Sequence, residues 1–192
     1  MTTKEQITQA TIDLTNELGL NGAATSKIAR KAGIAIGTLF HHFPTKQELV
    51  ETVFLGIYGD YVEWLSQKVN EHGVSLKKQL KMILRESIVY WLSKPEKFDF
   101  VYQVFYSKYY TESIETRTEA LQSEIVSKIK NGVEQKILRT SEAELLSPMI
   151  FHSIMTNSRL VISAPSETLR TRYRKEGQRF LWNAIKFTDK PK

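Results

Sequence analysis

The chain has 192 residues and no cysteine, and its 27 Lys and Arg outnumber its 21 Asp and Glu to give a formal net charge of +6. This length suffices for one or two small domains with a buried core. The lack of cysteine excludes a disulfide framework and a thiolate metal site. The first residues do not resemble a signal peptide, and no apolar run approaches the ~20 residues that cross a membrane, so we expect a cytoplasmic protein.

The first predicted element is a helix that ends at Gly19. Thr2 and Glu5 have the spacing of a capping box, which marks its start. Its inward positions recur at helical spacing and are Ile7, Thr11, Leu14 and Leu18.

Two short helices around a glycine turn follow, between Thr25 and Lys46. Thr25 or Ser26 can cap the first of them. Gly33 supplies the positive φ that a tight turn between helices needs. The second helix is expected over Ile36–Phe43.

Helical periodicity of about 100° per residue divides the second helix into two faces. The apolar face, which we expect to hold the helix against its neighbours, consists of Ile36, Leu39, Phe40 and Phe43. The opposite face consists of Gly37, Thr38, His41 and His42. Small and hydrogen-bonding residues suit a helix that lies close to the floor of a DNA major groove, so we predict that this face reads DNA.

The pattern IAxxAGxxxGTLFHHFPTKQEL resembles the DNA-binding helix-turn-helix of the tetracycline-repressor (TetR) family of bacterial transcriptional regulators, over about the first 55 residues. The resemblance implies base contacts near Gly37 and Thr38, and phosphate contacts from the family's counterparts of His42 and Lys46. Adding the residues at the start of the first short helix, the predicted DNA-binding set is Thr25, Lys27, Ile36, Gly37, Thr38, His41, His42 and Lys46.

Besides Thr15, where the family usually has an aromatic residue, three positions depart from the family pattern. The family usually has a tyrosine where Phe40 stands, and that hydroxyl reaches a phosphate. Ala35 replaces a common serine, and Ala24 replaces the usual Ser or Thr cap. We expect the first two changes to weaken non-specific affinity more than base discrimination.

The rest of the chain is also predicted to be helical, with no strand-like alternation, so the fold class is all-α with about nine helices. The expected helices cover 46–71, 75–92, a short helix opened by a capping box at Ser93 and Glu96, 112–136, 141–163, and a last one after the break at 164–166 that ends near Phe187. We predict a DNA-binding domain at 1–46 and a helical ligand-binding and dimerisation domain at 47–192.

An aromatic-rich group in the second domain can be ordinary core or the lining of an apolar small-molecule pocket. The resemblance implies a pocket in this region. The candidate lining residues are Trp64, Trp91, Tyr102, Phe105, Tyr106, Phe151 and Met155.

The last two predicted helices carry more apolar residues than one core seam needs. By resemblance, they pair with the same helices of a second copy to form a four-helix bundle, the alternative being coiled-coil-like surface packing. The candidate interface residues are Leu145, Met149, Leu160, Leu169, Tyr173, Phe180 and Ala184. We interpret the strong positive charge of residues 170–192, with eight basic and two acidic side chains, as a solvated helix face rather than a second DNA contact.

The sequence offers little for catalysis. The four histidines have no metal-ligand spacing, and no nucleophile or nucleotide fingerprint is present, so we expect no enzyme, metal or cofactor. The predicted function is a homodimeric regulator, most simply a repressor, that binds operator DNA and responds to a small-molecule effector. The alternatives are a DNA-binding protein without an effector, and a helical carrier or enzyme with a vestigial N-terminal module.

Overall fold

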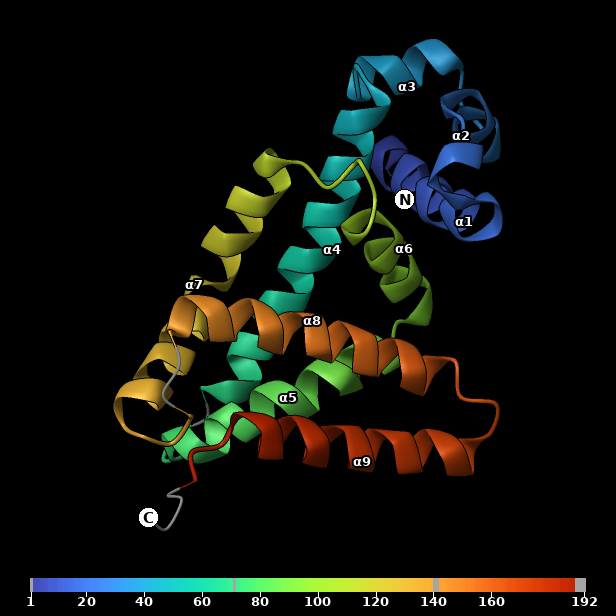
Figure 1. The fold of residues 1–192 in the computed structure, drawn as a ribbon. Coiled ribbons are helices and arrows are strands. Elements are labelled where there is room, and N and C mark those ends of the chain that lie inside the picture. The colour runs from blue at the N-terminus through green and yellow to red at the C-terminus, as the bar shows by residue number, and fades with distance from the viewer. Residues whose placement is uncertain (1, 71, 140–141, 189–192) are drawn as a thin grey trace. The chain divides into compact units, whose positions relative to one another are not determined.

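The structure, a computed structural model, describes residues 2–70, 72–139 and 142–188 (Figure 1). These residues form nine helices and no strand, which confirms the all-α prediction. The helices are α1 (Thr3–Gly22), α2 (Thr25–Lys31), α3 (Ile36–His42), α4 (Lys46–Val69), α5 (Leu76–Leu92), α6 (Pro95–Phe105), α7 (Glu112–Glu134), α8 (Ala143–Ile162) and α9 (Glu167–Ile185). None of these helices is long and apolar enough to span a membrane.

The helices pack as two compact units. Unit 1 comprises Met1–Asp60 and Lys94–Ala120, and unit 2 comprises Tyr61–Ser93 and Leu121–Lys192. The single helix α4 contributes residues to both units. The units do not follow sequence order, because α6 and the start of α7 pack with the N-terminal helices. The predicted domain boundary after residue 46 stays a prediction.

Unit 1 is built around α1, which packs against α2 on one side and α6 on another. The Nδ2 of Asn16 donates to the Glu96 carbonyl at 2.9 Å, and the Nε2 of Gln103 donates to the Thr15 carbonyl at 3.3 Å. These bonds join α1 to α6 across some 80 residues of sequence. The helix that supports α2 is therefore itself supported by the second segment of unit 1.

The ends of α1 are close to those predicted. The Thr2 hydroxyl accepts from the Glu5 N–H at 3.3 Å, and the Thr2 N–H donates to the Glu5 carboxylate at 2.8 Å, which confirms the capping box. Gly19 has φ of +72°, so the regular helix ends there, and one further turn reaches Gly22. The prediction that Leu18 points inward is wrong, because this side chain is exposed. The helix is interrupted at Gly19, and Leu20 is buried instead.

The capping box predicted at Ser93 and Glu96 is also wrong. The Ser93 hydroxyl instead donates to the Tyr90 carbonyl at 2.7 Å and closes α5. Pro95 is the first residue of α6, where its missing N–H costs nothing because that group would have no helical partner. The start predicted at residue 141 lies outside the described residues.

In unit 2, α5 packs against α8 and α9, and α8 packs along α9. Figure 1 shows α8 and α9 side by side. The core next to α5 is aromatic: the Tyr61 ring lies 5.3 Å from that of Tyr90 and 4.8 Å from that of Trp91, centroid to centroid. Rings in such offset contacts add stability beyond the area they bury.

Candidate nucleic-acid interface

The turn between α2 and α3 has the geometry that the sequence predicts. Gly33 has φ of +70°, its N–H donates to the Arg30 carbonyl at 3.2 Å, and the Ile34 N–H donates to the Ala29 carbonyl at 3.0 Å. These two bonds form a Schellman motif, which satisfies carbonyls at the end of α2. The direction of α3 relative to α2 is therefore fixed by backbone hydrogen bonds.

Both short helices begin without a side-chain cap. The N-cap positions are Ala24 and Ala35, and neither can accept a hydrogen bond from the first turn. The prediction that Thr25 or Ser26 caps α2 is wrong, because both residues lie inside its first turn. The missing caps leave the first N–H groups of both helices without the side-chain acceptor that Ser, Thr, Asp or Asn would provide.

Only half of the predicted apolar ridge holds α3 in place. Leu39 and Phe43 are buried, whereas Ile36 and Phe40 are 42% and 43% exposed. The exposed pair forms a second row about 60° around the helix from the buried pair. The helix α3 packs mainly against α2, and the second row lies beyond this contact and faces outward.

The predicted DNA-reading residues lie on the outside of unit 1. Gly37, His41 and His42 are exposed, and Thr38 is half-buried. A Cβ on Gly37 would meet nothing within 4 Å. The outward surface of α3 is thus wider than predicted, since it also includes Ile36 and Phe40.

The stretch of sequence that contains α2 and α3 carries only basic charged residues. No acidic residue occurs between Glu17 and Glu48. Within this stretch, Lys27 and Arg30 of α2 are exposed, while Lys46 is half-buried at the start of α4. An excess of basic side chains in this stretch favours a polyanionic partner.

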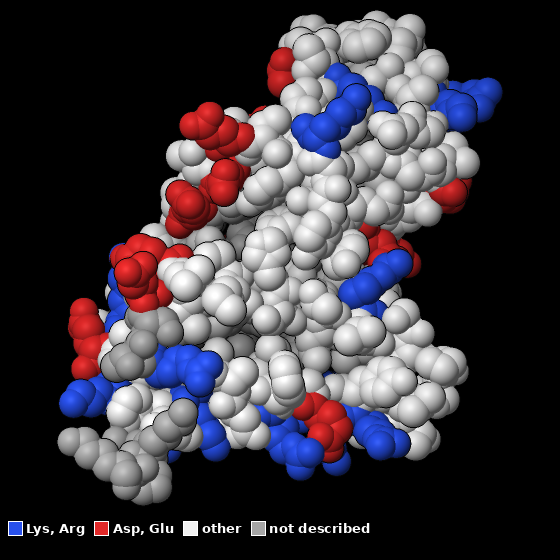
Figure 2. All heavy atoms as spheres, viewed as in Figure 1, with Lys and Arg blue, Asp and Glu red and all other residues white. Residues whose placement is uncertain are grey.

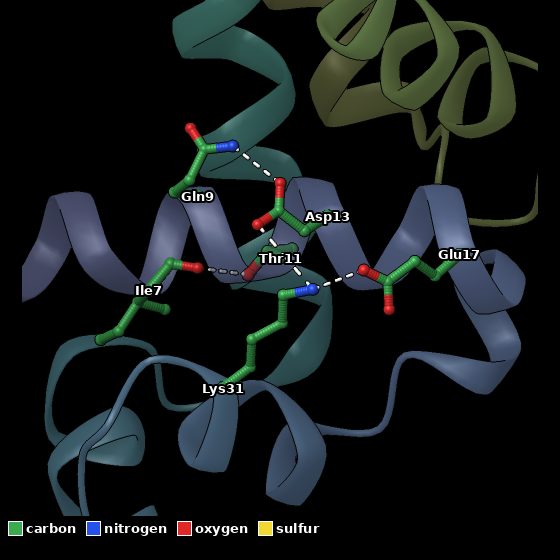
Figure 3. Close-up of polar contacts among 6 residues, drawn as sticks. All are labelled: Ile7, Gln9, Thr11, Asp13, Glu17 and Lys31. Carbon is green, nitrogen blue, oxygen red and sulfur yellow. Dashed lines mark hydrogen bonds and ion pairs between the residues drawn. The ribbon is translucent and has the colours of Figure 1, made fainter.

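Lys31 has a structural role instead (Figure 3). Its ammonium points from α2 towards α1, 2.5 Å from the Glu17 carboxylate and 3.9 Å from that of Asp13. The hydrogen bond to Glu17 raises the pKa of Lys31 above its ordinary value. Gln9 in turn donates to Asp13 at 2.8 Å. This polar group fastens α2, and with it the turn into α3, to α1.

Lys46 is held at the start of α4. Its ammonium donates to the Leu20 carbonyl and lies 5.5 Å from the centroid of the Tyr109 ring. Thr45 caps the helix, because its hydroxyl accepts from the Glu48 N–H at 3.1 Å. An ammonium has three protons, so Lys46 can also donate to a phosphate while it holds the Leu20 carbonyl. Its contact with a phosphate stays a prediction.

The candidate effector residues divide between the two units. Tyr102, Phe105 and Tyr106 belong to unit 1, where their rings contact one another, and Tyr106 is exposed. The remaining four belong to unit 2, where they are half-buried or buried: Trp64, Trp91, Phe151 and Met155. The groove described below is lined by other residues, so the predicted pocket stays a prediction.

The candidate dimer residues lie on exposed parts of α8 and α9. Phe180 is 73% exposed, the highest value of any large apolar side chain in the described chain. Exposed or half-buried with it are Leu145, Met149, Leu160, Leu169, Tyr173 and Ala184. Large apolar side chains gathered on one surface are typical of a protein interface.

The described residues contain no group of three or more His, Asp or Glu side chains that could hold a metal ion. His72 and His152 are both exposed.

Comparison with known proteins identifies the N-terminal module. The sequence profile of bacterial regulatory proteins of the tetR family matches residues 7–53, which contain α2 and α3. A tetR family transcription regulator from Shewanella sp. PV-4 superposes with a TM-score of 0.87 and 25% sequence identity, over 98% of this chain and 100% of that one. The N-terminal module belongs to the TetR family, and the chain as a whole has the fold of a family member.

Other family members share the fold but differ in sequence. The fatty acid metabolism regulator protein of Bacillus subtilis is 28% identical over 79 residues, which are 41% of this chain and 40% of that protein. The structure of the regulator FadR from Bacillus subtilis with stearoyl-CoA has a TM-score of 0.75 at 16% identity, over 94% of this chain and 98% of that one. These relatives are named as regulators and none as an enzyme.

Proposed function

We propose that this TetR-family protein is a transcriptional repressor that binds operator DNA through α3 and releases it when a small molecule binds. The observation that carries the proposal is the outward face of α3. It presents a glycine, two histidines and two apolar side chains, in a stretch without acidic residues, while Leu39 and Phe43 fix the helix from behind.

The exposed residues of α2 and α3 suggest two kinds of DNA contact. His41, His42 and Lys27 supply donors for phosphates, which fix the position of the protein on the duplex. Gly37 lets the backbone approach the base edges, and the exposed Ile36 and Phe40 can contact the methyl groups of thymine. Operator sites rich in thymine on the contacted strand therefore fit this face best.

The proposed active form is a homodimer in the cytoplasm. One α3 reads only a few base pairs, whereas two copies related by a two-fold axis read a palindrome. The exposed apolar residues of α8 and α9 supply a surface for the second copy. The most exposed large apolar side chains of this surface are Phe180, Met149 and Leu145.

The proposed effector is a small molecule bound by the aromatic residues predicted above. Support comes from the related FadR structure, which contains stearoyl-CoA. Effector and operator would then compete by a coupling free energy of typically ~1–3 kcal/mol. The helix α4 begins next to α3 and ends among the aromatic residues of unit 2, so its displacement can connect the two events.

The experiment that tests DNA reading is Gly37→Glu with Gly56→Glu as its control. Both replace an exposed helical glycine of unit 1 by glutamate, and neither new Cβ meets another atom within 4 Å. Gly37→Glu is expected to abolish binding to promoter fragments of the protein's own gene region, because it places a bulky anion against the groove. Gly56→Glu should bind nearly as the unchanged protein does. Equal binding by both variants, with steep salt dependence retained, would contradict the proposal.

A further inference from the structure

A groove between α5 and α9 in unit 2 is strongly basic. It has a volume of about 440 Å³. Its charged lining residues come from both helices and are Lys78, Lys81, Arg85, Lys175 and Arg179. No acidic residue in the described part of the chain lines it. Figure 2 shows Lys and Arg side chains along the edge that α9 forms, at the bottom of the view.

Most of this charge is not neutralised within the described chain. Arg85 pairs with Glu86 at 2.5 Å, and Arg179 pairs with Glu176 at 2.6 Å. The other three cations have no carboxylate within ion-pair distance among the described residues: Lys78, Lys81 and Lys175. Five positive charges against two negative ones leave +3 around a space the size of one small molecule.

One side of the groove is formed by an aromatic and an amide side chain of α9. Trp182 lines it from α9, and the Lys81 ammonium lies 4.9 Å from the centroid of its indole ring. Gln178 lines the same side, and its Nε2 is buried without a hydrogen-bond acceptor in the described part of the chain. An amide donor beside three unpaired ammonium groups suits a ligand with several oxygen acceptors.

We propose that this groove binds a small molecule that carries two or more phosphate groups. The cations face one space from two helices, which fits a compact polyanion better than a linear duplex backbone or a flat membrane surface. The volume lies in the range of small-molecule sites, roughly 300–1,000 Å³. The site lies wholly within unit 2, and it does not depend on the proposed DNA-binding function.

Calorimetric titration of the full chain with sodium tripolyphosphate tests this site, with ATP and adenosine as further arms. The test variant is Lys81→Gln with Lys175→Gln. Its matched control is Lys77→Gln with Arg172→Gln, which also removes one charge from each of α5 and α9 at exposed positions outside the groove. The test pair should lower the affinity for tripolyphosphate and ATP about tenfold or more, and the control pair only slightly. Adenosine should not bind.

Three results would overturn the proposal. The first is no binding of tripolyphosphate or ATP by a protein that retains its unfolding temperature. The second is an equal loss of affinity in both variant pairs, which would indicate attraction by net charge alone. The third is binding to phosphatidylglycerol vesicles or to duplex DNA through these lysines in place of tripolyphosphate, which would make the groove part of a surface for a larger anion.

Discussion

A Cβ atom on Gly177 of α9 would lie 1.6 Å from the Nδ2 of Asn157 on α8, and 2.5 Å from its Cγ. The side-chain amide of Asn157 therefore occupies the space that any other residue at position 177 would need. Among the glycines of the described chain, Gly177 leaves the least room for a Cβ atom. At this position α9 lies close against α8. The approach ties the register of α8 to that of α9.

We expect Gly177→Ala to destabilise the protein by about 1–3 kcal/mol, because the Asn157 amide must swing out of a packed contact. Urea unfolding measures the change. Asn157→Ala in the same chain should restore most of the loss, since it empties the contested space. The control is Gly59→Ala in α4, where a new Cβ meets nothing within 4 Å, and which should stabilise by roughly 0.5–1 kcal/mol. A Gly177→Ala protein as stable as that control would contradict the packing argument.

Phe40→Tyr should strengthen DNA binding several-fold. The side chain is 43% exposed, so a hydroxyl at its tip can reach a phosphate without disturbing the core. A new hydrogen bond of this kind is worth about 1 kcal/mol. Fluorescence anisotropy with a promoter fragment measures the gain, and the unfolding temperature should not change. A tyrosine variant that binds more weakly would show that Phe40 itself makes an apolar contact with the bases.

Phe180→Glu should convert the protein to a monomer at micromolar concentration. Its ring is 73% exposed on α9, and a carboxylate there would have to be desolvated in the proposed interface. Sedimentation equilibrium measures the change in mass, and operator affinity should fall with it. Leu121→Glu, at another exposed apolar position of unit 2, provides the comparison. Unchanged mass in the Phe180 variant would place the interface elsewhere.

Tyr61→Phe should flatten the alkaline loss of stability. Burial raises the pKa of the Tyr61 hydroxyl far above its ordinary value of 10.0, and the hydrogen bond with Ser87 opposes this only partly. Because the folded state keeps a proton that the unfolded state loses, this group's stabilisation is complete below pH ~10 and declines by up to about 1.4 kcal/mol per unit above it. Unfolding by urea at several pH values measures the slope.

The same variant should lose about 1 kcal/mol near neutrality, because the 2.8 Å bond between the Tyr61 hydroxyl and the Ser87 Oγ disappears. The Ser87 hydroxyl donates to the Ile83 carbonyl at 2.6 Å, so it accepts from Tyr61. Tyr173→Phe, at an exposed position of α9, is the control and should leave both the slope and the neutral stability unchanged. An identical alkaline slope in the Tyr61 variant would show that other groups cause the loss.

Local signals predicted the parts of the fold that depend on the backbone. Gly19 and Gly33 mark the ends of regular helices because each has a positive φ, and the capping residue Thr2 opens α1 as expected. Leu39 and Phe43 are buried as their spacing indicates. These features are decided within a few residues of sequence, so they can be recognised without knowledge of the tertiary structure.

Features that depend on a distant neighbour could not be predicted in this way. Periodicity places Ile36 and Phe40 close to the buried row of α3, but whether a second row is covered depends on the width of the surface that α1 and α2 offer. The basic groove combines Lys78 of α5 with Lys175 of α9, nearly 100 residues apart. Helical spacing places the groove residues of each helix on one face: Lys78 and Arg85 on α5, and Lys175, Arg179 and Trp182 on α9. Only the packing of α5 against α9 brings these two faces together.

The packing of α6 on α1 has a consequence for how the molecule can be divided. A fragment cut after residue 46 would lose the partner of the Asn16 and Thr15 contacts and leave that side of α1 in water. It also means that α6 supports α1, the helix against which α2 packs. The packing thus connects α6 to α3 by a continuous series of helix contacts, through α1 and α2.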